Sequence, residues 1–158
     1  MSAPFQPGES RSVSVVRRFA PEPEIERGGF VESQLGMSVR VYAYSGCDTC
    51  RRALKFLHAI GVVPEVIPIR ERPPSLVELR LALKSVGEDP RRLFNTSGRD
   101  YRELNLAARL PGMPLVDVLR LLRENGNLVK RPFVVADDKA WVGFNELAWK
   151  DRFRAACP

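Results

Sequence analysis

Two cysteines three positions apart are the residues of this sequence best suited to chemistry. Cys47 and Cys50 lie in the stretch SGCDTCRRALKFL, which begins at Ser45. A close cysteine pair outside a disulfide-rich scaffold is typical of redox chemistry or of metal binding. Four interpretations are open at this point: the redox couple of an enzyme, a redox sensor, half of a metal site, or two buried thiols.

The residues around the pair predict a strand before it and a helix after it. Residues 39–44, VRVYAY, alternate as a strand does, and apolar residues recur at helical spacing over residues 53–60. Positions i and i+3 of a helix lie about 5 to 6 Å apart, whereas a disulfide needs Cβ atoms about 3.5 to 4.5 Å apart. We therefore place Cys47 at the helix N-cap or just before it, and Cys50 in the first turn.

This placement gives the two sulfurs different roles. The first turn of a helix carries unpaired N–H groups and the positive end of the dipole, which favour a thiolate. Arg51 and Arg52 add positive charge close by. We predict that Cys47 is the exposed nucleophile and that Cys50 is the enclosed resolving thiol, which attacks the mixed disulfide.

A metal site is the weaker interpretation because the sequence lacks ligands for it. Structural zinc takes about four ligands. The chain has a single histidine, His58, and one further cysteine, Cys157. We expect no metal, and we expect His58 to lie on the helix surface or at the edge of the core.

The rest of the chain predicts an α/β fold. Residues 64–69, PEVIPI, form a second strand whose two prolines favour a sheet edge. A β-hairpin is predicted from FVVAD and AWVGF, which flank Asp138 and Lys139. Helices are predicted from the N-cap Ser75, with Glu78 three residues on, to Gly87, near 90–94, around 100–106, from Pro114 to Gly126, and after the N-cap Asn145. The order βαβ, helices, ββα predicts a four-stranded sheet with helices packed against it.

Composition limits the class of protein. Residues 1–36 contain four prolines and little periodicity, so we expect them to form a disordered N-terminal extension. The domain is expected at residues 37–158. Met37 is an alternative translation start to Met1. The chain has no long apolar run and no signal-peptide pattern, which predicts a cytoplasmic protein without membrane contact. The net charge of +6 is spread along the chain. We therefore expect no direct binding of nucleic acid.

Residues 39–153 resemble the ArsC-like thioredoxin-fold family, which contains glutaredoxin-coupled arsenate reductases and Spx/MgsR transcriptional regulators. Four boxes in this order carry the resemblance: YSGCDTCRRALKFL, LFNTSGRDYRELNL, LVKRPFVV and WVGFNELAW. The resemblance implies a thioredoxin-like four-stranded mixed sheet with an inserted helical subdomain at about residues 74–127.

The resemblance also implies roles for single residues. Cys47 matches the reactive cysteine, Arg131 matches an arginine that helps to bind oxyanion, and Pro132 is expected to be cis and to face the cysteines. Cys50 is absent from the glutaredoxin-coupled reductases but matches the CxxC of the Spx-type regulators. The other arginines of the reductase site align with Asn95 to Ser97 and with Gly143, unless Arg99 or Arg102 substitutes. Their loss argues against arsenate reduction.

The expected function is that of a thiol-disulfide oxidoreductase with a redox-active disulfide between Cys47 and Cys50. The resemblance implies no bound cofactor, with glutathione or a thioredoxin or glutaredoxin as the reductant. The alternative is a redox-sensing transcriptional regulator that binds RNA polymerase through the helical subdomain, where Gly87 lies near the expected contact.

Overall fold

A four-stranded sheet forms the centre of the protein. The structure is a computed structural model, and it describes residues 37–155. The predicted extension at 1–36 and the third cysteine, Cys157, lie outside these residues. The strands are β1 (Val39–Ala43), β2 (Glu65–Pro68), β3 (Phe133–Ala136) and β4 (Lys139–Val142), in the spatial order β2-β1-β3-β4.

The sheet is mixed, as predicted. Strands β1 and β2 are parallel, and the helix α1 (Asp48–Ala59) connects them. The pairs β1–β3 and β3–β4 are antiparallel. Strand β2 lies at the sheet edge, where a proline within the strand is tolerated because an edge residue need not donate to a neighbour.

Two helix starts confirm the capping residues predicted from the sequence. At α2 (Leu76–Ser85), Ser75 and Glu78 form a reciprocal capping box. At α6 (Glu146–Ala155), the Oδ1 atom of Asn145 accepts a hydrogen bond of 2.9 Å from the N–H of Ala148. These local contacts fix where both helices begin.

The segment between α2 and β3 differs in detail from the prediction. The turn near residue 90 is a 3₁₀ helix, η1 (Pro90–Leu93), and the predicted helix at 100–106 is split because Asn105 has a φ of 49° in the left-handed region. The other elements of this segment are α3 (Arg99–Glu103), α4 (Leu106–Arg109), η2 (Leu110–Gly112) and α5 (Leu115–Glu124). The subdomain boundaries at 74 and 127 stay a prediction.

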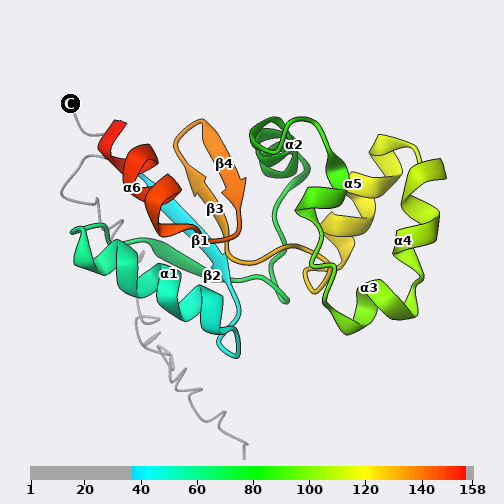
Figure 1. The fold of residues 1–158 in the computed structure, drawn as a ribbon, viewed down its shortest axis with the longest axis horizontal. Helices are drawn as coiled ribbons and strands as arrows, with labels where there is room; N and C mark the ends of the chain where they lie inside the picture. Colours follow the sequence, from blue (N-terminus) through cyan, green and yellow to red (C-terminus); the bar gives the residue numbers. More distant parts are fainter. Residues whose placement is uncertain (1–36, 156–158) are drawn as a thin grey trace, which may run out of the picture. The chain divides into compact units, whose positions relative to one another are not determined.

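Each face of the sheet has its own apolar core, and Figure 1 shows α1 and α6 beside the sheet on the side away from α2 and α5. Val41 and Val134 pair across β1 and β3 and belong to the core that α1 and α6 cover. Tyr42 and Phe133 are the next pair and belong to the core of α2 and the helical segment. This alternation follows from the two-residue period of a strand. Within residues 37–155, no helix is long and apolar enough to span a bilayer.

A buried carboxylate ties α2 to the sheet. Glu78 is 6% exposed. Its oxygens accept hydrogen bonds from the Tyr42 hydroxyl at 2.9 and 3.0 Å, and one oxygen lies 2.9 Å from a guanidinium nitrogen of Arg40. Burial and the Glu78 carboxylate together raise the pKa of Tyr42 to about 12. Burial alone would raise the pKa of Glu78, but hydrogen bonds from Ser75 and Tyr42, together with the charge of Arg40, hold it below its ordinary value.

We expect Glu78→Gln to lower the free energy of unfolding by about 1 to 3 kcal/mol at pH 7, because the substitution removes the charge from a buried hydrogen-bonded network. A carboxylate with a lowered pKa stabilises the fold above its unfolded pKa and loses this contribution as the pH falls. The difference between wild type and variant should therefore shrink below the ordinary carboxyl pKa of 4.5. Urea unfolding at pH 7 and pH 3.5 measures this difference.

The matched control is Glu103→Gln, which neutralises the exposed partner of Arg99. We expect little change in stability at either pH, because exposed ion pairs contribute little. A stability loss in Glu78→Gln that is the same at both pH values would contradict the role given to its charge.

Candidate functional site

The turn between β1 and α1 places Cys47 at the N-cap of the helix. The backbone N–H of Cys47 donates to the carbonyl oxygen of Tyr44 at 3.0 Å, and the Cys47 carbonyl accepts from the N–H of Arg51 at 3.1 Å. The Cys47 side chain makes no capping hydrogen bond, and the residue is half-buried. This confirms the predicted position at the positive end of the helix dipole.

Cys50 lies one turn further along α1 and is buried, with 1% of its surface exposed. Both cysteines are free thiols in this structure. Burial, together with a hydrogen bond to the nearby Cys47 side chain, raises the pKa of Cys50 to about 11, although the Tyr44 backbone and the charge of Arg131 act in the opposite direction. The two thiols are therefore adjacent but differ in exposure, as predicted.

The sheet register brings the Arg131–Pro132 bond toward the same turn. Tyr42 pairs with Phe133 in the antiparallel β1–β3 ladder. Continuing this register places Pro132 opposite Ala43 and Arg131 opposite Tyr44. The Arg131–Pro132 peptide bond is cis, as the resemblance implied. The structure thus brings Arg131 near the cysteines, since its charge acts on Cys50.

Tyr44 is a residue of the site that the sequence did not indicate. The guanidinium carbon of Arg131 lies 5.3 Å from the centroid of its ring, and that of Arg70 lies 3.8 Å from the same centroid. The ring also lies against Gly46, where an added Cβ would be 2.7 Å from the Tyr44 Cε1 atom. Tyr44 stands in the quoted box YSGC, but its contact with Arg70 depends on the fold and has no local signal.

A groove of about 360 Å³ opens beside the buried cysteine. Its walls come from α1, the preceding turn, and the edge strand β2. Val66, which is 50% exposed, lies on the β2 wall. The lining residues are Ala43, Tyr44, Ser45, Cys50, Arg51, Leu54, Val66, Pro68 and Glu71. The groove offers an apolar surface next to the dithiol.

The positions that the resemblance aligns with the other reductase arginines make structural contacts in this fold. Gly143 has a φ of +76°, and its N–H donates to the Pro132 carbonyl at 2.8 Å. The Asn95 side chain donates to the carbonyl of Asn127 at 3.4 Å. Arg99, a candidate substitute, forms an ion pair with Glu103 instead. A glycine is favoured at a positive φ, so position 143 suits an arginine poorly.

No group of three or more His, Cys, Asp or Glu side chains within residues 37–155 is arranged to hold a metal ion. His58, the single histidine, lies exposed on α1. The expectation of a metal-free site stays a prediction.

A comparison with known protein families shows the family to which the chain belongs. The model of the ArsC family matches residues 42–152, which include both cysteines, Arg131 and Pro132. The chain belongs to the ArsC family. This assignment confirms the family inferred from the four sequence boxes, and the sheet with its flanking helices is the thioredoxin-like fold of this family.

Proteins similar to this chain include an uncharacterized protein, a transcriptional regulator and a possible arsenate reductase. The uncharacterized Bacillus subtilis protein YusI is 44% identical over 110 residues, covering 70% of this chain and 93% of that protein. The global transcriptional regulator Spx of Enterococcus faecalis is 30% identical over 67% of this chain and 79% of its own. A solved structure from Streptococcus mutans, described as a possible arsenate reductase, is 34% identical with a TM-score of 0.63, and the match covers 68% of this chain and 91% of that one.

The raised pKa of Cys50 has a kinetic consequence. If Cys47 forms a mixed disulfide, the attack of Cys50 on that disulfide should become faster as the pH rises. Attack requires the thiolate, whose fraction rises about tenfold per pH unit below the pKa. Because burial is the largest cause of the raised Cys50 pKa, closure of the intramolecular disulfide should accelerate from pH 7 to pH 9. Stopped-flow release of the second thiol, measured in a single turnover, checks this expectation. A rate that is level over this range would contradict it.

Proposed function

We propose that this ArsC-family protein is a thiol-disulfide oxidoreductase that uses Cys47 and Cys50 as its redox pair. The observation that carries the proposal is the asymmetry of the two thiols on α1. Cys47 is half-buried at the helix N-cap with no side-chain capping bond, and Cys50 is buried next to it. A substrate can therefore reach the Cys47 thiol, and the buried Cys50 thiol can reach Cys47.

The reaction proceeds in two exchanges. The Cys47 thiolate attacks one sulfur of a substrate disulfide, a Cys47–substrate disulfide forms, and the other half of the substrate leaves as a thiolate. That thiolate takes up the proton of Cys50, and the Cys50 sulfur then attacks Cys47 Sγ and displaces the second half as a thiolate. The substrate gains two electrons, and the Cys47–Cys50 pair loses two.

A further thiol must return the pair to its reduced form. Glutathione, thioredoxin or glutaredoxin can do this by the reverse exchange, and we place the reaction in the cytoplasm, where such reductants keep thiols reduced. Arsenate is the less suitable acceptor, because Gly143 and Asn95 occupy positions where the reductases have arginines. Each missing charge-assisted contact would forfeit about 1.5 to 3 kcal/mol.

A coupled assay tests the proposal. The full chain is given hydroxyethyl disulfide, and separately arsenate, with either glutathione and glutathione reductase or thioredoxin and thioredoxin reductase. We expect NADPH oxidation with the disulfide in at least one system and none with arsenate. The absence of turnover with every acceptor would reject the oxidoreductase.

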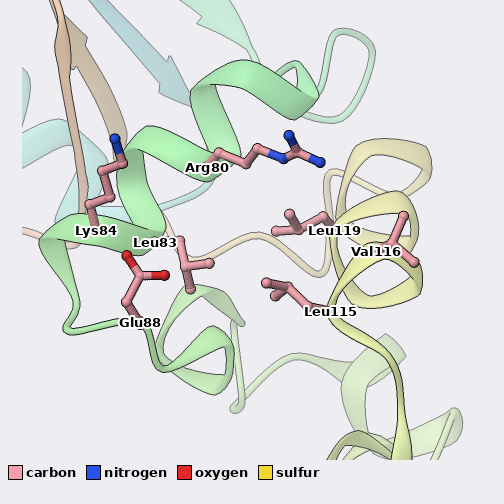
Figure 2. Close-up of a pocket in the computed structure, with 7 residues that line it drawn as sticks. All are labelled: Arg80, Leu83, Lys84, Glu88, Leu115, Val116 and Leu119. Carbon is pink, nitrogen blue, oxygen red and sulfur yellow. The ribbon is translucent and has the colours of Figure 1, made fainter.

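A second candidate function is redox-controlled binding of RNA polymerase, as in the Spx-type regulators. It is supported by the Spx relatives and by an apolar groove of about 360 Å³ between α2 and α5. Figure 2 shows Leu83 from α2 facing Leu115 and Leu119 from α5, with Arg80 extending along the rim. Leu115 and Val116 are 46% and 53% exposed and line this groove together, so they present a joined apolar surface to a partner.

The polymerase alternative is tested by co-purification of bacterial RNA polymerase with the oxidised and the reduced protein. If this function is correct, Leu115→Glu should abolish the complex. The control Leu147→Glu changes an exposed leucine of α6 and should not. Gly87 follows the C-cap of α2 with a φ of +72°, so its glycine also has a purely structural reason. No complex in either redox state would reject this candidate.

A further inference from the structure

Two arginines gather at one uncharged ring beside the cysteines. Arg70 follows β2, and Arg131 precedes β3. These two strands lie on opposite sides of β1 in the sheet. Their guanidinium carbons lie 3.8 and 5.3 Å from the centroid of the Tyr44 ring. A cation is attracted to an aromatic face, but two cations at one ring repel each other unless an anion lies near them.

Within the described part of the chain, neither Arg70 nor Arg131 forms an ion pair. The Nη1 atom of Arg131 is also fully buried and has no hydrogen-bond acceptor there. Buried guanidinium nitrogens are nearly always hydrogen-bonded, so such an atom indicates a ligand group that the protein itself does not supply. A carboxylate suits it, because two parallel N–H donors of a guanidinium match the two carboxylate oxygens.

This pair of arginines adjoins the proposed redox couple. The Tyr44 carbonyl accepts the N–H of Cys47 at 3.0 Å, and the ring of Tyr44 lies against Gly46 in the same turn. Two carboxylates lie near this turn, and among the described residues neither forms an ion pair with Arg70 or Arg131: Asp48 pairs with Arg51, and Glu71 lines the groove beside Cys50. A substrate whose sulfur reaches Cys47 would place its neighbouring groups close to the two free guanidinium groups.

We propose that Arg70, Tyr44 and Arg131 form a carboxylate-binding subsite, which selects disulfide substrates that carry a carboxylate near the reacting sulfur. The inference rests on the proposed oxidoreductase function and names its substrate class. Arg131 supplies the buried donor, Arg70 supplies the second charge, and Tyr44 holds both guanidinium groups in place. The subsite takes no part in the electron transfer, which remains the two exchanges at Cys47 and Cys50.

Single-turnover rates with three disulfides test the selectivity. The reduced full chain is mixed with glutathione disulfide, which carries carboxylates, with neutral hydroxyethyl disulfide, or with cationic cystamine. We expect the second-order rate constant to be highest for glutathione disulfide and lowest for cystamine, with the difference decreasing in high salt. Arg70→Gln should lower the ratio of the glutathione disulfide rate to the cystamine rate about tenfold, the equivalent of one charge-assisted contact.

The matched control is Arg72→Gln, which removes a neighbouring exposed arginine and should leave the ratio unchanged, because the arginines over the Tyr44 ring are Arg70 and Arg131. An equal loss in both variants would overturn the subsite, because it would show an effect of net charge alone. A wild-type ratio of the glutathione disulfide rate to the cystamine rate near one would also overturn the subsite.

A binding measurement separates failure of the subsite from failure of the proposed function. S-methylglutathione carries the carboxylates but cannot exchange, and calorimetry measures its affinity for the full chain. If it binds and Arg70→Gln weakens this binding, the carboxylate subsite stands even where no disulfide is turned over. If disulfides are reduced but S-methylglutathione binds equally to wild type and Arg70→Gln, the subsite is wrong and the oxidoreductase stands.

Discussion

Cys47→Ser is expected to lower disulfide reduction by about a thousandfold or more, because it removes the nucleophile that forms the first covalent bond. A serine hydroxyl at the same N-cap cannot carry the sulfur exchange. The substitution should leave the fold intact, since serine is a favoured N-cap residue and Cys47 is only half-buried. The NADPH-coupled assay with hydroxyethyl disulfide measures the loss.

The control for this prediction is Cys157→Ser, which removes the thiol that has no part in the proposed redox pair. Its turnover should equal that of the wild type. Turnover of Cys47→Ser within tenfold of the wild type, or its loss in Cys157→Ser, would assign the chemistry to another thiol.

Gly126→Ala is expected to have the largest effect on stability, a loss of about 3 kcal/mol or more in the free energy of unfolding. Gly126 lies after α5 against the chain that leaves β2. A Cβ atom built on it would lie 1.8 Å from the carbonyl oxygen of Ile69 and 2.7 Å from the carbonyl carbon. Both are backbone atoms, which cannot rotate away, so α5 or the end of β2 must shift. Urea unfolding of the full chain measures the loss.

Gly112→Ala is the matched control, because a Cβ at Gly112 meets no atom within 4 Å. It should change the stability by less than about 1 kcal/mol. Equal stabilities of the two variants would mean that the close approach at Gly126 relaxes at little cost. A large loss in Gly126→Ala would also report on the site, since the segment that it displaces leads directly to Arg70.

The local features of this protein could be predicted because short stretches of sequence determine them. The alternation before Cys47 and the helical spacing after it place the N-cap at Cys47 without any knowledge of the fold. The capping box at Ser75 and Glu78 is another such feature, since its two hydrogen bonds join residues within one helical turn. The edge position of β2 follows from its prolines in the same way.

The features that join distant segments could not be predicted from local pattern. Glu78 was predicted only as a capping residue, yet it also accepts hydrogen bonds from Tyr42, and this partner depends on how α2 packs on the sheet. The contacts of Arg70 and Arg131 with Tyr44 likewise arise from the strand order β2-β1-β3. The break between α3 and α4 at Asn105 was missed because asparagine is tolerated in a helix and only sometimes adopts a positive φ.

The most direct test of the asymmetric Cys47–Cys50 pair is to trap the mixed disulfide with Cys50→Ser. If Cys47 attacks and Cys50 resolves, the reduced Cys50→Ser protein mixed with glutathione disulfide should accumulate a one-to-one glutathione adduct. Mass spectrometry of the peptides should locate this adduct on Cys47, and Cys47→Ser should form no comparable adduct on Cys50. An adduct that forms on Cys50 in Cys47→Ser as fast as on Cys47 in Cys50→Ser, or no adduct in either variant, would contradict the asymmetric pair.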